Sequence, residues 1–353
     1  NTEILTVTDV NGNSATCSTI VTVIDTVRPT AICQNITVQL NNTGTGSTTA
    51  AAVNNGSSDA CGIQSLSLSQ TTFVCAEVGA NTEVLTVTDV NGNSTTCTTV
   101  ITVEDNVAPV AICQNITVQL DITGNANIAA SQVDNGSSDA CGIASLALNV
   151  TTFSCNNVNA NTVILTVTDV NGNSSTCAST VTVLDTVRPV PNCQNVTVFL
   201  NNTGTGATTA SAVNNGSTDN CTIASMVLSQ TSFVCAEVGA NTEILTVTDV
   251  NGNSATCSTI VTVLDTVRPI ATCQNITVQL NNTGTGSTTA AAVNNGSSDA
   301  CGIQSLGLSQ TTFVCAEVGA NTEVLTVTDV NGNSTTCSTT ITVEDNVAPV
   351  AVC

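Results

Sequence analysis

Residues 85–94 read LTVTDVNGNS, and this stretch decides the fold. Leu85 and Val87 alternate with threonine, which predicts a half-buried β-strand. The Asn91-Gly92 pair that follows is the strongest short hairpin signal, because both residues accept positive φ angles. Alternation then resumes and continues to Val103. The stretch therefore predicts the last hairpin of a β-sheet domain.

The same ten residues recur every 80 residues, beginning at Leu5, Leu85, Leu165, Leu245 and Leu325. A fixed period defines the structural unit of a repeat protein. Residues 1–80 and 241–320 differ only at positions 24, 30, 32 and 67, which indicates a higher period of three modules and recent tandem duplication. We expect modules at 26–105, 106–185, 186–265 and 266–345, with the C-terminal hairpin of a preceding module at 1–25 and the start of a following module at 346–353.

The other segments of each module also read as short strands. Ile36, Val38 and Leu40 alternate with polar residues, and the Gly-containing segments NNTGTG and NNGSSDACG separate successive strands. No stretch has a convincing helical period. Short strands with frequent turns are typical of an all-β sandwich. One phenylalanine per module supplies an aromatic anchor, at Phe73, Phe153, Phe233 and Phe313.

Composition narrows the range of functions. The net charge is −22 and the only cationic side chains are three arginines, so nucleic acids and anionic membranes would be repelled. The chain has no His, Lys or Tyr, which leaves few groups for acid–base or nucleophilic catalysis. Paired carboxylates could hydrolyse glycosides. Identical sites in every module, without aromatic residues to bind a sugar, argue against that activity. An enzyme is therefore not expected, and no segment approaches the roughly 20 apolar residues of a membrane span.

Three motifs resemble a known family. They are PTAICQNITV at residues 29–38, TVTDVNGNSTTC at 86–97 and VTVID at 21–25. Together they are similar to hyalin-repeat (HYR) modules and to the tandem immunoglobulin-like repeats of large bacterial surface proteins. The resemblance covers every module. It implies a tandem array of immunoglobulin-like β-sandwich modules arranged end to end, with a role in adhesion or as a spacer.

Each module carries four cysteines on the 80-residue lattice, which indicates disulfides formed in an oxidising compartment. Zinc is disfavoured, because His and C-x-x-C pairs are absent. The first and last strands of an immunoglobulin-like sandwich run parallel and close together, so Cys33 and Cys97 can pair, and Cys61 and Cys75 remain. The expected bonds are Cys33–Cys97, Cys61–Cys75, Cys113–Cys177, Cys141–Cys155, Cys193–Cys257, Cys221–Cys235, Cys273–Cys337 and Cys301–Cys315.

A bond between Cys17 and Cys33 would use all eighteen cysteines. However, the strand and linker between them span about 50 Å if the chain is straight, and a disulfide needs Cα atoms within about 7 Å. Pairing inside each module is therefore preferred. It leaves Cys17 and Cys353 without partners in this sequence.

Acidic and amide side chains are expected to converge at one pole of each module. The linker, the NNGSSDACG loop and the hairpin turn should all lie there, and their oxygens suit Ca²⁺. Turn chemistry alone also favours Asp and Asn at such positions. The candidate ligands are Asp25, Asp59, Asp89, Asn91, Asn93, Glu104, Asp105, Asp139, Asp169, Asn171, Asn173, Asp185, Asp219, Asp249, Asp265, Asp299 and Asp329.

The junctions fall into two types. Three read DTVRP, from Asp25, Asp185 and Asp265, and two read EDNVAP, from Glu104 and Glu344. The second type has an additional carboxylate and no arginine, so we expect it to bind calcium better. In the first type, Arg28, Arg188 or Arg268 would pair with a carboxylate in place of the metal.

These features favour an extracellular structural protein at a cell surface, of bacterial type, that forms a long fibre, stalk or filament. Its partners would be copies of itself, laterally or head to tail, or neighbouring modules of a longer chain. The alternative is an adhesin whose modules bind a glycan or a protein. Phe199 favours that alternative, because it replaces the outward glutamine of the other modules. An ice-binding role for the Thr-x-Thr strands is more distant.

Overall fold

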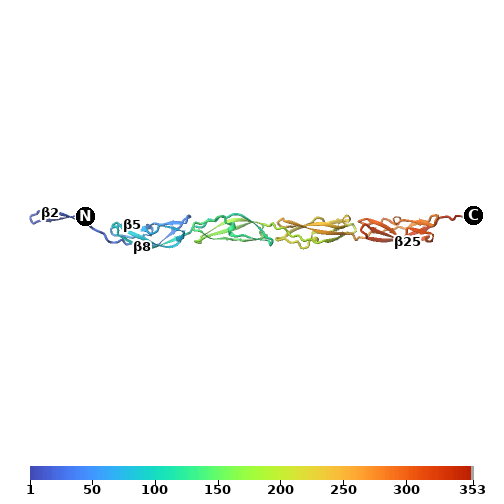
Figure 1. Ribbon diagram of the computed structural model, residues 1–353, viewed down its shortest axis with the longest axis horizontal. Coiled ribbons are helices and arrows are strands. Elements are labelled where there is room, and N and C mark those ends of the chain that lie inside the picture. The colour runs from blue at the N-terminus through green and yellow to red at the C-terminus, as the bar shows by residue number, and fades with distance from the viewer. Residues whose placement is uncertain (351–353) are drawn as a thin grey trace. The chain divides into compact units, whose positions relative to one another are not determined.

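The computed structural model describes residues 1–350, whose secondary structure is almost entirely β. A hairpin of β1 (Thr2–Thr8) and β2 (Ser14–Ile20) comes first. Eight elements then occur four times in the same order, and the repetition can be followed along the colours of Figure 1. The chain divides into two compact units, residues 1–118 with 126–184, and residues 119–125 with 185 onward.

The first and second modules contain the same series of elements. The first consists of β3 (Ile36–Gln39), β4 (Thr45–Ser47), α1 (Ala50–Val53), β5 (Ile63–Leu68), β6 (Thr72–Val74), the 3₁₀ helix η1 (Cys75–Glu77), β7 (Gly79–Asp89) and β8 (Ser94–Glu104). The second consists of β9 (Ile116–Gln119), β10 (Asn125–Asn127), α2 (Ala130–Val133), β11 (Ile143–Leu148), β12 (Thr152–Ser154), η2 (Cys155–Asn157), β13 (Asn159–Asp169) and β14 (Ser174–Leu184).

The third and fourth modules repeat that series. The third consists of β15 (Val196–Phe199), β16 (Thr205–Ala207), α3 (Ala210–Val213), β17 (Ile223–Leu228), β18 (Ser232–Val234), η3 (Cys235–Glu237), β19 (Gly239–Asp249) and β20 (Ser254–Leu264). The fourth consists of β21 (Ile276–Gln279), β22 (Thr285–Ser287), α4 (Ala290–Val293), β23 (Ile303–Leu308), β24 (Thr312–Val314), η4 (Cys315–Glu317), β25 (Gly319–Asp329) and β26 (Ser334–Glu344).

Each module is an immunoglobulin-like β-sandwich. In the first, one sheet has the strand order β3-β8-β7-β5 and the other pairs β4 with β6. The first strand, β3, runs parallel to the last strand, β8, with Ile36 opposite Ile101. Strands β7 and β8 form the predicted hairpin, in which Leu85 lies opposite Cys97. The predicted fold class is confirmed, as a tandem array of all-β modules with an 80-residue period.

The core of each module lies between its two sheets. Leu85 and Val87 from β7 and Ile101 and Val103 from β8 are completely or almost completely buried. Threonines at alternate positions face away from this core, as the period of a strand requires. The predicted aromatic anchors are confirmed, because all four are at most 3% exposed: Phe73, Phe153, Phe233 and Phe313.

The helices are single turns, which is why no helical period is visible in the sequence. α1 begins after Thr49, whose hydroxyl accepts a hydrogen bond from the N–H of Ala52, and Val53 at its end is buried. Capping of this kind stabilises a short helix. Within residues 1–350, every helix is too short to span a membrane.

The four predicted bonds between first and last strands are confirmed. They join Cys33 to Cys97, with Cα atoms 6.0 Å apart, and likewise Cys113–Cys177, Cys193–Cys257 and Cys273–Cys337. Parallel pairing of β3 with β8 brings Cys33, which precedes β3, beside Cys97 in β8, although 64 residues separate them.

The second predicted set of bonds is wrong. Cys75 bonds Cys141 of the next module, not Cys61, and Cys235 bonds Cys301, not Cys221. This also excludes Cys141–Cys155 and Cys301–Cys315. Cys155 and Cys221 are both disulfide-bonded. The reason is that β5 carries the chain along the module between Cys61 and Cys75, so these two residues lie at opposite ends.

Three cysteines in the described residues are free and exposed, Cys17, Cys61 and Cys315. Cys17 was expected to lack a partner, whereas Cys61 and Cys315 were not. Cys353, also expected to be unpaired, lies outside the described residues.

Candidate cation site at the linker pole

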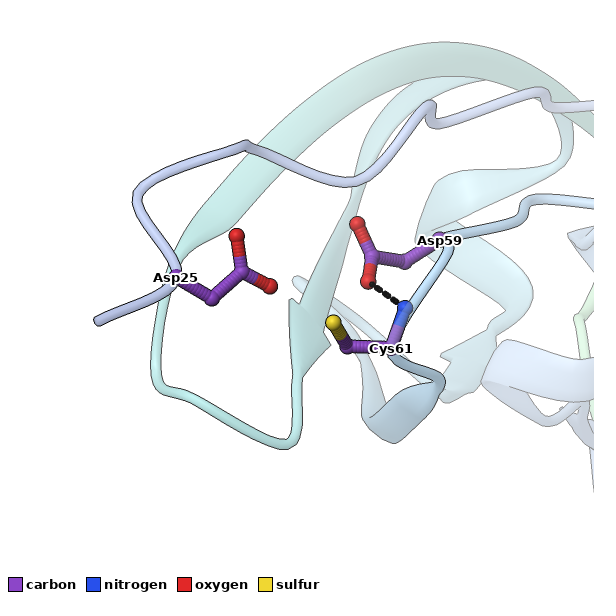
Figure 2. Close-up of side chains that lie close together, drawn as sticks. All are labelled: Asp25, Asp59 and Cys61. Atoms are coloured by element: carbon purple, nitrogen blue, oxygen red, sulfur yellow. Dashed lines mark hydrogen bonds between the residues drawn. The ribbon is translucent and has the colours of Figure 1, made fainter. Parts of the chain in front are cut away.

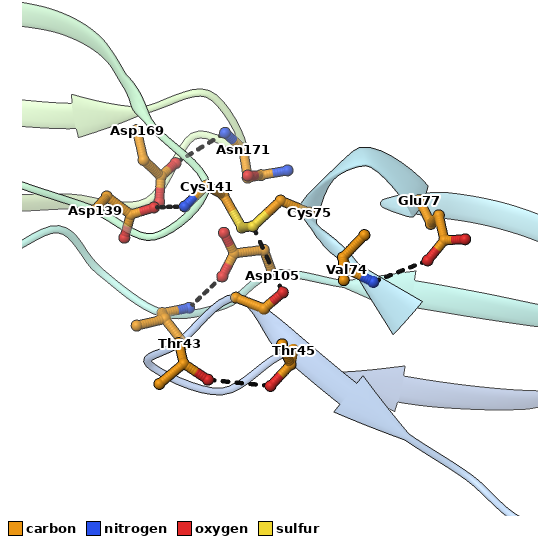
Figure 3. The surroundings of a disulfide bond; sticks show 12 residues. Thr43, Thr45, Val74, Cys75, Glu77, Asp105, Asp139, Cys141, Asp169 and Asn171 are labelled. Carbon is orange, nitrogen blue, oxygen red and sulfur yellow. Dashed lines mark hydrogen bonds between the residues drawn. A yellow bond between two sulfur atoms is a disulfide. The ribbon is translucent and has the colours of Figure 1, made fainter. Parts of the chain in front are cut away.

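Each module has a pole at which three segments meet, which we name the linker pole. In the second module it is formed by the linker from Asp105, the loop containing Asp139 and Cys141, and the turn from Asp169 to Asn173 (Figure 3). The linker runs from the last strand of the preceding module, and the turn joins β13 to β14. The segments predicted to converge do so.

The hairpin aspartate is occupied by its own turn. Asp89 is fully buried, and its Oδ1 accepts hydrogen bonds from the backbone N–H groups of Asn91 and Asn93, both at 2.8 Å. Its Oδ2 accepts a third from the Asn93 side-chain amide at 2.8 Å. Burial acts to raise the pKa of Asp89, but the hydrogen bonds from Asn93, Asn91 and Gly92 together outweigh it and hold the pKa below its ordinary value.

The N-terminal hairpin shows that these bonds are local. Asp9 accepts the same three hydrogen bonds, from the N–H groups of Asn11 and Asn13 at 3.0 and 2.8 Å and from the Asn13 side-chain amide at 3.0 Å. The residues around it are exposed. The DVNGN motif therefore makes its turn wherever it occurs, and turn chemistry explains Asp89, Asn91 and Asn93 without a metal.

The turn also anchors the linker. The side-chain amide of Asn93 donates to the backbone carbonyl of Asp25 at 3.1 Å, and Asn173 donates to that of Asp105 at 3.0 Å. The corresponding bonds recur at the other two linker poles, from Asn253 to Asp185 and from Asn333 to Asp265. The amide of this asparagine thus fixes the start of the linker through its nitrogen.

The linker aspartate has unused bonding capacity. Asp105 is 6% exposed, and its Oδ1 accepts from the N–H of Val107 at 3.1 Å. Its Oδ2 is buried and has no hydrogen-bond partner. The same is true of Oδ2 in Asp185 and in Asp265, which are 7% and 8% exposed. A buried carboxylate oxygen without a partner is costly, so each of these positions favours a cation.

A second carboxylate faces the first at every linker pole. Asp139 accepts from the N–H of Cys141 at 2.8 Å through one oxygen, and ligand atoms of Asp105, Asp139 and Cys141 lie within 4.8 Å of one another. The same grouping occurs in the fourth module with Asp265, Asp299 and Cys301, and in the first with Asp25, Asp59 and Cys61 (Figure 2). Asp25 and Asp59 are only half-buried.

The linker pole of the third module gathers three carboxylates. Asp185, Asp219 and Asp249 come within 4.8 Å of one another, and two of them are buried. Asp219 accepts from Cys221 through Oδ2 and leaves Oδ1 buried without a partner. The side-chain amide of Asn220 donates to Asp185 Oδ1 at 3.2 Å. Two unpartnered oxygens in one cluster fit a hard cation such as Ca²⁺, which binds oxygen ligands.

Some predicted ligands lie elsewhere. Glu104 accepts from the side-chain amide of Gln39 at 2.8 Å and from that of Asn106 at 3.3 Å, outside the Asp105 cluster. Its carboxylate therefore gives the EDNVAP junction no additional ligand. Asn91 and Asn171 donate hydrogen bonds from their backbone N–H groups to Asp89 and Asp169 of their turns. No ion pair joins Arg28, Arg188 or Arg268 to a carboxylate within residues 1–350.

Two features of the site were missed at the sequence level. Cys141 and Cys301 lie beside the carboxylates because they hold the loop to the preceding module. Asn220 contributes only in the third module, where it replaces the alanine of the other three. Alignment of the four loops shows that substitution, so the sequence contained a signal for it.

Comparison with known proteins supplies no residue roles. No protein family and no curated protein matches the chain. Solved structures to which the chain is similar include protocadherin gamma B7 extracellular cadherin domains 1–4, at 14% identity over 79% of this chain and 91% of that one, with a TM-score of 0.30. Drosophila N-cadherin EC1–4 gives 10% identity, 88% and 99% coverage and a TM-score of 0.27. A three-domain immunoglobulin fragment of titin has 9% identity over 67% of this chain and 98% of its own, with a TM-score of 0.30.

Proposed function

We propose that this chain is a structural repeat protein of the extracellular space, which forms a long fibre, stalk or filament with Ca²⁺ at its module junctions. One observation carries the proposal. A disulfide crosses from one module to the next at the same pole where buried linker carboxylates lack partners. Both features lie at the junction between two modules.

The disulfide supports a fixed junction between modules. Cys75 follows β6 in the first module, and Cys141 lies in the loop at the linker pole of the second. Gly44 packs against both modules, since a Cβ atom there would lie 2.6 Å from Cys75 Sγ in the first and 3.2 Å from Ala140 Cβ in the second. Contact this close, with a covalent bond beside it, restricts rotation about the linker.

Calcium would complete the junction. Asp105 and Asp139 would hold it in the second module, Asp185, Asp219 and Asp249 in the third, and Asp265 and Asp299 in the fourth. Bound there, the ion would neutralise buried carboxylates and tie the linker to the loop. The unpartnered oxygens are the basis for this choice of ligands. Carboxylate oxygens are the ligands that calcium prefers.

The chemistry of the chain supports an extracellular location. Disulfides persist in oxidising compartments, and they occur both within and between modules. The surface is acidic, with a net charge of −22, and threonine-rich strands leave few charges to guard sheet edges against pairing with another copy.

Small-angle scattering of the whole chain, before and after chelation, tests the proposal. With calcium we expect a maximum dimension of at least about 160 Å, from about 40 Å per module. Chelation should broaden the distance distribution through flexible junctions. A variant carrying Asp105→Asn, Asp185→Asn and Asp265→Asn should behave as the chelated protein in both conditions. If calcium and chelator give the same profile for the unaltered chain, the ions do not stiffen it.

An adhesin is the second candidate, on the strength of Phe199. This side chain lies on β15 and is 59% exposed, whereas the equivalent position holds glutamine in the other modules. Binding of the chain to immobilised cell-surface glycans, compared with Phe199→Gln, tests it. If the parent and the Phe199→Gln variant bind equally, Phe199 does not contribute to adhesion and the argument for this candidate fails.

A further inference from the structure

One face of the third module differs from the same face of the other modules. It is the outer face of the four-stranded sheet, whose strand order is β15-β20-β19-β17. Side chains alternate along each strand between this face and the buried core. Val227 is 61% exposed and Phe199 is 59% exposed. We name the large apolar residues exposed on this face the apolar strip: Phe199, Val227, Ile244, Ile260 and Leu264.

The pairing of the strands places these five positions along one diagonal of the sheet. Phe199 lies directly opposite Leu264, because β15 runs parallel to β20. Ile244 lies one diagonal step from Ile260 in β20 and one diagonal step from Val227 in β17. Diagonal neighbours in a sheet are about 7–8 Å apart, within reach of large side chains. The apolar strip therefore crosses the sheet from the edge strand β15 to the edge strand β17.

The fourth module provides an internal comparison for this face. Its sheet has the same strand order, and every other paired position of the outer face holds the same residue in the two modules. The five differences all make the third module more apolar or larger. The equivalent residues of the fourth module are Gln279, Gly307, Val324, Thr340 and Glu344. The difference between the two faces is thus confined to the apolar strip.

The apolar strip also lacks charge. Glu104 in the first module and Glu344 in the fourth occupy the position of Leu264. Within the strands of the third module, Glu243 is 7% exposed on the inner face, where it accepts a hydrogen bond from Ser229. The chain as a whole carries a net charge of −22, which opposes contact between copies. On this face two copies can meet without bringing carboxylates together.

A second copy suits this surface better than a charged partner or a glycan. A basic partner gains nothing from a face without carboxylates. A glycan is held by polar groups and several aromatic rings, whereas the apolar strip has one ring, that of Phe199. An identical strip offers apolar side chains that can cover all five positions, as in sandwiches whose sheets pack face to face. Contact between identical faces is self-complementary and closes as a pair.

We propose that the apolar strip of the third module binds the same strip of a second copy of this chain, and that this contact joins fibres side by side. The proposal rests on the proposed structural function and names the surface through which copies associate. Phe199 then belongs to a contact between copies.

The size of the face sets the strength of the pair. Strands about 4.8 Å apart, the longest of 11 residues, give the outer face roughly 600 Å². Two copies would bury about 1,200 Å² in total, which is at the lower limit for a stable specific interface. The dimer of a single chain is therefore expected to be weak. A fibre that presents several such faces would gain strength from avidity.

Sedimentation velocity over a wide range of chain concentrations tests the pairing, with free thiols alkylated so that disulfides cannot join copies. The unaltered chain should form a dimer as its concentration rises. Added salt should favour the dimer, because it screens the repulsion between the acidic remainders of the two copies. Chelator should leave the dimer intact. A dimer that chelator dissociates is bridged by metal ions and contradicts the proposal.

The first module supplies a matched variant. Phe199→Gln, Val227→Ser and Leu264→Glu give the third module the residues with which the first module forms the same sheet. This triple variant should raise the dissociation constant of the dimer at least tenfold. Ile122→Asn is the control, because Ile122 is 82% exposed in the second module and the other modules hold asparagine there. It should leave the dissociation constant unchanged.

Three outcomes would overturn the proposal: a monomer at every concentration, a dimer that the triple variant retains, or equal weakening by Ile122→Asn. If the chain stays monomeric and the triple variant loses binding to immobilised glycans, the apolar strip belongs to the adhesin candidate. Scattering of the triple variant with and without calcium tests the structural function separately. Stiffening without pairing of the parent removes only this proposal, whereas pairing without stiffening removes only the calcium junction.

Discussion

Two disulfides of almost equal span have different consequences. Cys33–Cys97 closes 64 residues and Cys75–Cys141 closes 66. The first joins Cys33, which precedes β3, to Cys97 in the parallel strand β8 of the same module, and the second joins the far end of one module to the linker pole of the next. Sequence separation is therefore uninformative about the role of a bond here. What matters is the pole of the module at which each cysteine lies.

The largest expected effect separates the two bonds. Cys33→Ala with Cys97→Ala should destabilise the first module by about 4 kcal/mol, because the unfolded chain regains the freedom of a long loop. Cys75→Ala with Cys141→Ala should cost either module less than that, because the 66-residue loop is shared between two modules and only the part inside the unfolding module gains freedom. Hydrogen exchange followed by mass spectrometry measures the stability of each module separately. It also needs no fluorescent residue, and the chain contains no Trp or Tyr. If both double variants lost the same unfolding free energy, the two bonds would not differ in their contribution to module stability.

The next effect concerns the charge beside the Cys75–Cys141 bond. Asp105→Asn removes a buried carboxylate whose Oδ2 has no partner. Without divalent cations the variant should be more stable than the parent, by about 1–3 kcal/mol, and with calcium it should be less stable. Thermal unfolding in chelator and in calcium measures the stability difference between variant and parent in each condition. Glu104→Gln is the control, because Gln39 and Asn106 hold the Glu104 carboxylate away from the cluster. This variant should have the stability of the parent both in chelator and in calcium.

A smaller effect tests how closely the modules must approach. Gly44→Ala and Gly56→Ala both place alanine at positive φ, +71° and +81°, which costs about 1–2 kcal/mol. Only at Gly44 does the new Cβ atom meet Cys75 Sγ and Ala140. Gly44→Ala should therefore also lower the fraction of Cys75–Cys141 peptide after oxidative refolding. A full yield of that bond in both variants would mean that the junction tolerates a wider gap.

The smallest effect is acid sensitivity. Asp89 and Asp169 have pKa values held below the ordinary value, so they favour the folded state above the unfolded pKa of about 3.9. That contribution is lost as pH falls through the lower, folded-state pKa. Stability measured between pH 5 and pH 2 should decline in the first module, and Asp89→Asn should flatten the decline. A parallel decline in the variant would assign the acid sensitivity to other carboxylates.

Much of the module was predictable because its signals are local. The Asp89 turn, the alternation along β7 and the phenylalanine anchors follow from residues close in sequence. The parallel pairing that brings Cys33 to Cys97 follows from the sandwich class. The Cys75–Cys141 bond depends on contact between modules, and pairing cysteines inside each module concealed it. Strand β5 spans about 20 Å between Cys61 and Cys75, so the distance test that excluded Cys17–Cys33 also opposed that pair.

The candidate site was predictable in part for the same reason. Asp105 shares the strand face of Val103, and Glu104 faces the other way, so period two alone separates the ligand candidate from its neighbour. Which oxygens lack a hydrogen-bond partner depends on the linker, the loop and the turn together. No single segment of sequence contains that information.

The N-terminal hairpin has a consequence for how a module folds. Leu5 is 59% exposed and Leu85 is fully buried, yet the turns at Asp9 and Asp89 accept the same hydrogen bonds. The hydrogen bonds of the turn are local, so the hairpin can form within microseconds, whereas pairing of β3 with β8 must first close a loop of 65 residues. We expect the β7–β8 hairpin to be structured in the folding transition state and β3 to join last, which φ-value measurements on the two pairs would check. The Cys33–Cys97 bond would then form late, and its oxidation rate in refolding would report completion of the module.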